Sequence, residues 1–207
     1  MISGRQQKTC LPEYSAIRYH TYFNMSNYHF ITRWNLPTTC EEVYRTLEEA
    51  EDLARWWPSV YLDVKQVEKG QPGGVGKVIE LYTKGWLPYT LRWKFRVTET
   101  DFPNGYALEA IGDFKGRGVW TFRQTDANNC EVVYDWQISA EKPLLKLLTP
   151  LLRPLFSFNH LWAMRKGEES LRLELQRRHA KSEEEKSNIP APPPPTFPHN
   201  LLNNKIL

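Results

Sequence analysis

One long helical pattern, in residues 143–181, constrains the fold of this chain more than any other feature. Counted from Pro154, it predicts a helix of roughly 28 residues and about 42 Å, which is longer than a small domain is wide. Residues 155–164 are apolar nearly all round, so we expect this half to be covered on several sides and the later half on one side only. The expected buried face carries Phe156, His160, Ala163, Gly167, Leu171 and Leu175.

The middle of the chain reads as strands that are separated by turns. Residues 91–98 and 132–138 alternate between apolar and polar side chains, which is typical of strands with one buried face. Six such strands follow from Tyr61 onward, and a seventh is expected at 28–35. The turns are short and rich in glycine, proline and asparagine, so neighbouring strands are expected to pair antiparallel.

Two short helices are expected between the first and second strands. Thr39 and Glu42 have the spacing of a capping box, which marks the start of the first helix, and Pro58 ends the second. A seven-stranded antiparallel sheet with one apolar face buries that face most simply by curling round the long helix. The sequence therefore predicts an α+β fold.

These patterns divide the chain into three segments. Residues 1–24 show neither helical nor strand period and form an N-terminal extension, with Met25 as an alternative start of the natural domain. Residues 25–181 form the folded domain. Residues 182–207 hold a charge run and then a proline tract, which predicts a disordered tail. The prolines at 192–195 either recruit a polyproline-binding domain or belong to a passive tail.

Composition and charge narrow the function classes. Three cysteines, far apart and without paired spacing, argue against a disulfide framework and a zinc site, and they favour the reducing cytoplasm. No apolar run reaches the roughly 18 residues of a membrane span, and the N-terminus lacks the pattern of a signal peptide. The net charge of +3 is small, which disfavours nucleic acid as a partner. Arg92, Lys94 and Arg96 alternate along one strand, where a solvated face is the first interpretation and contact with an anionic membrane or nucleic acid the second.

Three segments resemble sequences of a known superfamily: GDFKGRGVWTF at 112–122, VVYDWQI at 132–138 and NHLWAMRKGEESL at 159–171. With the order of strands and helices, they make residues 28–176 similar to the START-like, or SRPBCC, superfamily and to its polyketide cyclase/dehydrase branch. The resemblance implies a helix-grip fold with a cavity between sheet and helix for a lipid, an isoprenoid or a polyketide. Only some members of the superfamily catalyse a reaction, so the fold does not choose between binding and catalysis.

The chain holds 8 Trp, 10 Tyr and 9 Phe, which is more aromatic residues than packing alone usually requires. These side chains either line the cavity that the resemblance implies or form ordinary core, and we expect the first. The candidate pocket residues are Trp57, Trp93, Phe95, Trp120, Phe122, Tyr134 and Trp136 from the sheet side, with Phe156, His160 and Met164 from the helix.

His160 is the one histidine in the apolar part of the helix. Its ordinary pKa suits a general acid or base, but the sequence fixes no second catalytic group, so a structural histidine is the first interpretation. The five histidines show no metal-ligand spacing, and the glycines at 112–118 lack the strand-to-helix setting of a phosphate loop. We therefore expect neither a metal nor a cofactor.

Other polar and small residues leave alternatives open. Glu109 is expected to face water, whereas Asp113 and Arg117 remain candidates for anchoring a ligand head group. Residues 143–156 form either a lid over the cavity or a weak membrane contact, and we favour the lid. Gly167 interrupts the buried helical face, which indicates either a close approach by the sheet backbone, which we favour, or space at one end of the cavity.

Binding of a hydrophobic small molecule is therefore the first functional hypothesis. The second is a cyclase or dehydratase that acts on a polyketide-like substrate, with His160 carrying a proton. The third is a peripheral membrane protein that handles lipid and docks through residues 143–156.

Overall fold

The computed structural model of the protein describes residues 28–140 and 143–197, with side chains except those of 114, 140 and 143–152. The expected N-terminal extension, 1–24, lies outside the described residues. Along the chain follow β1 (Tyr28–Leu36), α1 (Cys40–Glu48), a 3₁₀ turn (Ala50–Asp52), α2 (Leu53–Trp56), β2 (Tyr61–Glu68), β3 (Val78–Lys84), β4 (Thr90–Asp101), β5 (Gly105–Gly112), β6 (Phe114–Asp126), β7 (Asn129–Ala140), α3 (Pro143–His179) and α4 (Glu183–Asn188).

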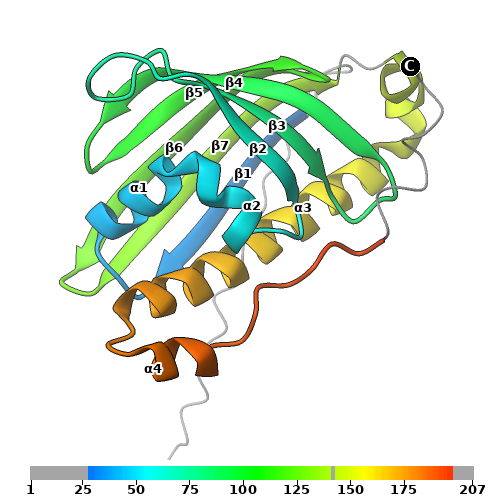
Figure 1. Ribbon diagram of the computed structural model, residues 1–207. Helices are drawn as coiled ribbons and strands as arrows, with labels where there is room; N and C mark the ends of the chain where they lie inside the picture. Colours follow the sequence, from blue (N-terminus) through cyan, green and yellow to red (C-terminus); the bar gives the residue numbers. More distant parts are fainter. Residues whose placement is uncertain (1–27, 141–142, 198–207) are drawn as a thin grey trace, which may run out of the picture.

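The strands form one antiparallel sheet in the order β1-β7-β6-β5-β4-β3-β2. Neighbours in sequence pair through short turns, and β1 joins the far edge by pairing with β7, from Tyr28 opposite Ile138 to Leu36 opposite Cys130. Figure 1 shows the sheet curving over α3, with α1 and α2 on the same side of the sheet as this helix. The predicted seven-stranded helix-grip fold is confirmed.

Alternation along the strands decides which side chains face the helix. On β7, Val132, Tyr134 and Trp136 are buried, and the residues between them are only half-buried. On β4, Leu91, Phe95 and Val97 are likewise buried. Because successive side chains of a strand point to opposite faces, these apolar positions form one continuous inner surface.

The basic residues of β4 lie on the outer face and have partners there. Lys94 Nζ lies 3.3 Å from Glu80, and Arg96 lies 3.1 Å from Glu68. The guanidinium of Arg92 lies 4.3 Å from the centre of the Tyr82 ring. This row is thus a set of cross-strand pairs rather than a patch of unpaired positive charge.

The capping of α1 ties the first helix to the last part of α3. The Thr39 hydroxyl accepts a hydrogen bond from the Glu42 backbone N–H at 3.2 Å, as the sequence predicts. The Glu42 carboxylate does not complete a capping box. It accepts instead from the Thr38 hydroxyl and lies 2.5 Å from His179 Nε2 at the end of α3.

The long helix begins earlier than expected, at Pro143 instead of Pro154, and has 37 residues. Proline fits the first position of a helix, because the N–H there has no partner within the helix. Residues 143–156 are expected to form either a lid over the cavity or a membrane contact. Both interpretations depend largely on the side chains of residues 143–152, which are not among the described side chains. None of the helices in the described part of the chain combines the length and the apolar composition that a membrane span requires.

The C-terminal segment differs from the predicted disordered tail. Ser182 caps α4 by accepting from the Glu185 N–H at 3.1 Å, and the chain then runs back along α3 (Figure 1, orange to red). We call residues 189–197 the strap. Its proline-rich sequence suits an extended backbone, and its end is held by tertiary contacts that composition alone does not reveal. Residues 198–207 of the expected tail lie outside the described part of the chain.

Candidate ligand cavity

A cavity of about 140 Å³ lies between the first half of α3 and the inner face of the sheet. Its walls come from strands β1, β2, β3, β4 and β7, from α3, from the segment that joins α2 to β2 and from the loop between β3 and β4. Seven of the ten candidate pocket residues border this cavity: Trp57, Trp93, Tyr134, Trp136, Phe156, His160 and Met164.

Phe95, Trp120 and Phe122 do not border the cavity, which corrects the expectation for these three residues. They share the inner face of the sheet, but the short helices fill the space beneath them. Phe95 borders a separate hollow of about 30 Å³ together with Tyr44 of α1. The Trp120 ring stacks on Tyr134 with a centroid distance of 4.0 Å, and the Phe122 ring meets Tyr44 edge to face at 6.1 Å. These three aromatic residues are core.

Several cavity residues escaped the sequence analysis. Tyr28 and Phe30 of β1 border the cavity, because the register of this strand places them opposite Ile138 and Trp136 of β7. Asn159 comes from α3, where it precedes His160 on the buried stripe. The alternation along β1 and the helical period of α3 could have indicated that these three residues lie on the buried faces. Further residues that border the cavity are Val60, Tyr61, Thr83, Lys84, Gly85, Tyr89, Leu91 and Ala163.

His160 lies in an apolar setting. Its ring stacks on Phe30 with centroids 4.1 Å apart, and its buried Nε2 has no hydrogen-bond partner among the described residues. Burial lowers the pKa of His160 to about 3, because the charged form would lose its water without gaining a partner. The imidazole is therefore neutral across the physiological pH range.

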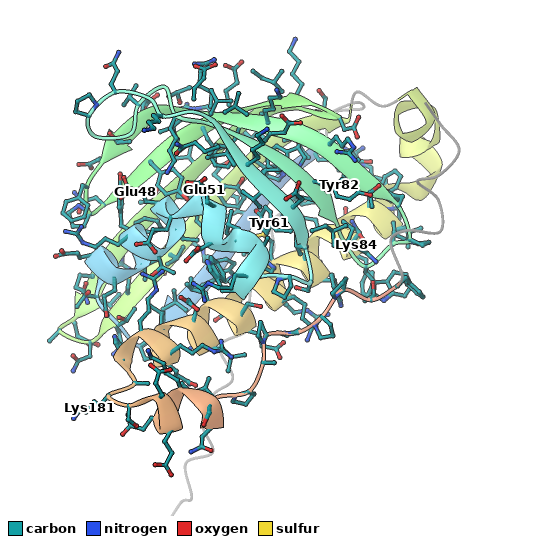
Figure 2. The ribbon with its side chains drawn as sticks, in the orientation of Figure 1. Glu48, Glu51, Tyr61, Tyr82, Lys84 and Lys181 are labelled. Atoms are coloured by element: carbon teal, nitrogen blue, oxygen red, sulfur yellow. The ribbon has the colours of Figure 1, made fainter. Side chains whose placement is uncertain are left out.

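Apart from Lys84, the other polar groups of the cavity are also neutral. Trp93 Nε1 donates to the Thr83 hydroxyl at 3.0 Å, whereas Trp57 Nε1, buried as well, has no partner in the described part of the chain. Burial raises the pKa of Tyr61, and it raises that of Tyr89 to about 12. Figure 2 shows Tyr61 in the middle of the molecule, beneath the sheet. Apart from Lys84, the cavity thus offers uncharged hydrogen-bonding atoms within aromatic walls.

The loop between β3 and β4 borders the cavity and is fixed to α3 by one side chain. Asn159 Oδ1 accepts a hydrogen bond from the Leu87 N–H at 2.9 Å. A Cβ atom on Gly85 would lie 2.4 Å from the same amide group, so a larger residue here would displace the Asn159 side chain. The loop and the helix therefore form one side of the cavity together.

The polar candidates Glu109, Asp113 and Arg117 do not border the cavity. Glu109 is exposed, as expected. Arg117 pairs with Glu99 at 2.9 Å on the exposed face, and the Asp113 carboxylate accepts from the Arg92 N–H at 2.9 Å. No group of three or more potential metal-ligating side chains occurs among the residues that the structure describes.

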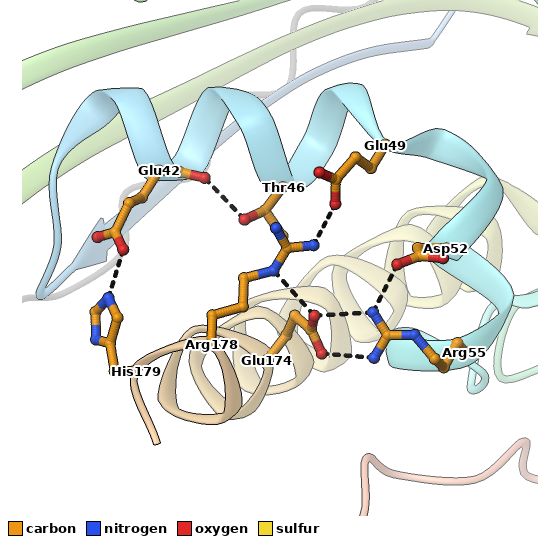
Figure 3. A network of polar contacts seen from close by, with 8 residues as sticks. All are labelled: Glu42, Thr46, Glu49, Asp52, Arg55, Glu174, Arg178 and His179. Atoms are coloured by element: carbon orange, nitrogen blue, oxygen red, sulfur yellow. Dashed lines mark hydrogen bonds and ion pairs between the residues drawn. The ribbon is translucent and has the colours of Figure 1, made fainter. Parts of the chain in front are cut away.

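The second half of α3 is held by an ion-pair network, which we call the clamp (Figure 3). Glu174 at its centre is only 3% exposed. Its two oxygens accept from Arg55 of α2 at 2.8 and 2.9 Å, and one of them also accepts from Arg178 at 3.0 Å. Arg55 further contacts Asp52, and Arg178 contacts Glu49. The clamp fastens α3 to the segment that carries the short helices.

Gly167 lies between the cavity and the clamp. A Cβ atom at this position would lie 2.2 Å from the Trp57 ring, which is closer than real Cβ contacts allow. The close approach that the sequence indicates is therefore present, but the partner is the indole of Trp57 and not the sheet backbone. The glycine lets this ring lie flush against the helix at one end of the cavity.

Comparison with known proteins agrees with this architecture. Residues 36–164, more than half of the chain, match the family described as polyketide cyclase / dehydrase and lipid transport. No relative with a curated function matches the sequence at a significant level.

Among solved structures, the Zhui aromatase/cyclase from Streptomyces sp. R1128 is similar with a TM-score of 0.59 at 16% identity, over 75% of this chain and 97% of that chain. A protein from Thermus thermophilus gives a TM-score of 0.54 at 20% identity and covers 69% of this chain and 95% of that chain. A protein from Mycobacterium smegmatis gives a TM-score of 0.53 at 13% identity and covers 73% of this chain and 92% of that chain. At these identities the likeness is one of fold alone.

Proposed function

This chain belongs to the polyketide cyclase/dehydrase and lipid transport family, and on that premise we propose that it binds a hydrophobic small molecule between its sheet and α3. The observation that carries the proposal is the aromatic-walled cavity of about 140 Å³. An engineered apolar cavity of about 150 Å³ in another protein holds one benzene molecule. The buried part of the ligand is therefore about one aromatic ring with a short substituent, and not a long lipid chain or a fused polyketide.

Burial of such a ring does not give strong binding by itself. It contributes about 2–3 kcal/mol, and the loss of translational freedom on association opposes it. Polar contacts must supply the rest. Trp57 Nε1 and His160 Nε2, both buried beside the cavity without partners among the described residues, suit a hydroxyl or carbonyl oxygen on the ligand.

Binding is favoured over catalysis by the protonation states in the cavity. A general acid or base works best when its pKa lies near the operating pH, whereas burial lowers the pKa of His160 to about 3. Burial shifts the pKa values of Tyr61 and Tyr89 in the opposite direction, also away from neutrality. We therefore rank the cyclase or dehydratase hypothesis second.

The binding proposal is tested by native mass spectrometry of the purified full chain, with Ala163→Leu as the variant that fills the cavity. We expect a co-purified small molecule on the wild type and its loss from Ala163→Leu. Ala180→Leu, directly after the last residue of α3, is the matched control and should retain the molecule. Two further results would count against the proposal: a wild type that binds no small aromatic molecule in added-ligand titrations, and an Ala163→Leu protein that binds as well as the wild type.

The membrane hypothesis for residues 143–156 makes a separate prediction. If this segment docks on lipid, the protein floats with anionic liposomes in a density gradient. The binding proposal expects the protein to remain at the bottom of the gradient.

A further inference from the structure

Lys84, at the end of β3, is buried beside the cavity without a carboxylate partner among the described residues. Its exposed fraction is 3%, and the residue borders the cavity. Its Nζ donates a hydrogen bond to the backbone carbonyl of Phe197 at 3.1 Å. Lysine is almost never fully buried unless it is paired, so a neutral carbonyl as its acceptor calls for an explanation.

The cover over Lys84 is the end of the strap. The Phe197 ring centre lies 5.4 Å from Lys84 Nζ and 6.3 Å from the ring of Trp86, and the Thr196 hydroxyl donates to the Trp86 carbonyl at 3.1 Å. Figure 2 shows Lys84 next to this end of the chain. Phe197 itself is 43% exposed, so part of its side chain faces solvent.

Lys84 is the last residue of β3, so it borders the cavity where the strand ends, and its side chain turns toward the strap. The preceding residue, Thr83, points inward and accepts from Trp93. Because neighbouring side chains of a strand point to opposite faces, the Lys84 side chain leaves the cavity wall toward the strap. A ligand whose apolar body fills the cavity would reach this ammonium only with a head group near the end of β3.

The present partners of Lys84 satisfy its charge incompletely. Burial lowers its pKa, which means that the surroundings disfavour the ammonium form. A carbonyl oxygen and an aromatic ring are weaker partners for an ammonium than a carboxylate, which forms a charge-assisted hydrogen bond. A ligand carboxylate would give the Lys84 ammonium the stronger partner that it lacks among the described residues.

We propose that Lys84 binds a carboxylate on the ligand of this cavity, in the position that the Phe197 carbonyl takes in this structure. The inference rests on the proposed function and narrows the ligand class to small aryl or arylalkyl carboxylic acids. The ring lies among the aromatic walls, and the acid displaces the end of the strap from Lys84.

The test uses two probes of nearly identical shape, 3-phenylpropanoate and 3-phenylpropanamide, titrated into the full chain at pH 7 by calorimetry. They differ in charge but share the ring and the linker. We expect the wild type to bind the acid at least about tenfold more tightly than the amide, as a charge-assisted hydrogen bond implies. Lys84→Met keeps the apolar stem but has no charge, so it should bind the acid no more tightly than the amide. Lys84→Arg should still bind the acid more tightly than the amide.

Lys77→Met is the matched control. Lys77 Nζ also donates to a backbone carbonyl, that of Glu48 at 2.8 Å, but it does not border this cavity. The control should keep the preference for the acid. A preference that survives in Lys84→Met, or equal affinities in the wild type, overturns the role of Lys84 while the binding function stands. If the wild type binds neither probe nor any other small aromatic molecule, the proposed function fails, and this inference fails with it.

Discussion

The two halves of α3 lie under the same sheet but meet their surroundings differently. From Phe156 to Met164 the helix borders a cavity, and a buried imidazole nitrogen there has no partner among the described residues. From Gly167 to Arg178 the helix is packed against Trp57 and ends in the clamp. The two halves of the helix therefore have different roles. The clamped half fixes the position of the helix against the short helices. The other half can then border a cavity while the fold stays intact.

The largest expected difference between the halves concerns Leu171 and Met164. Leu171 is fully buried in the clamped half, so Leu171→Ala opens a new cavity and should lower the free energy of unfolding by about 3–4 kcal/mol. Met164 already borders a cavity and has fewer packing contacts to lose, so Met164→Ala should lower it by about 2 kcal/mol. Urea unfolding of both variants measures the difference. Equal losses would show that the two halves are packed alike.

The second prediction concerns acid stability in the cavity half. Above pH 6.5 the imidazole of His160 is neutral in both the folded and the unfolded protein. Between pH 6.5 and about 3 only the unfolded form takes up the proton, so the free energy of unfolding falls as the pH falls. The expected loss from this group is about 2–3 kcal/mol between pH 6.5 and 4.5.

His160→Phe should remove this part of the pH dependence, because the phenyl ring keeps the stacking on Phe30 and carries no titratable group. Thermal melts of the wild type and the variant at intervals between pH 7.5 and 4.5 provide the measurement. Parallel curves would mean that the imidazole reaches solvent in the folded protein.

The third prediction concerns the boundary between the halves. Gly167→Ala gains helix propensity of about 1 kcal/mol, but the new methyl group overlaps the Trp57 ring. Overpacking costs about 1–3 kcal/mol, so the net expectation is a loss of about 1–2 kcal/mol. In a double-mutant cycle with Trp57→Leu, the penalty of Gly167→Ala should largely disappear. Additive effects would show that the ring is not what limits this position.

The smallest effect is expected for Glu174→Gln in the clamp. Burial acts to raise the pKa of Glu174, but the hydrogen bonds from Arg55 and Arg178 outweigh it and hold the pKa below 4.5. The carboxylate therefore stabilises the fold above pH 4.5, and this contribution is lost as the pH falls below that value. Since both arginines keep other carboxylate partners, the expected loss in the variant is about 1 kcal/mol at pH 6, and it shrinks as the pH falls below 4.5. A constant difference over this range would contradict the prediction.

Local periodicity was enough to predict the architecture. The alternation in β4 and β7 and the stripe of α3 each identify a buried face, and the short turns leave only antiparallel pairing between neighbours. The capping interaction of Thr39 follows from the same local rules. The resemblance to a known superfamily agreed with this pattern at each step.

The cavity was predictable only in part. An alternating strand pattern shows which face a residue occupies but not its depth along the sheet, and depth separates Trp93 and Trp136, which border the cavity, from Trp120, which lies in the core. The start of α3 and the ordered strap depend on contacts between distant segments, such as the one that joins Lys84 to Phe197. Such contacts leave no periodic signal in the sequence.

The position of β1 in the sheet has a consequence for the order of folding. Its only neighbour is β7, which begins at Asn129, roughly 90 residues after β1 ends at Leu36. At a synthesis rate of about 5–20 residues per second, the ribosome needs on the order of 5–20 s to complete this partner. During that interval the aromatic face of β1, with Phe30 and Trp34, has no sheet to join. We therefore expect the nascent chain to depend on a holding chaperone at this stage, and closure of the sheet by β1 to be a late, slow step of refolding in vitro.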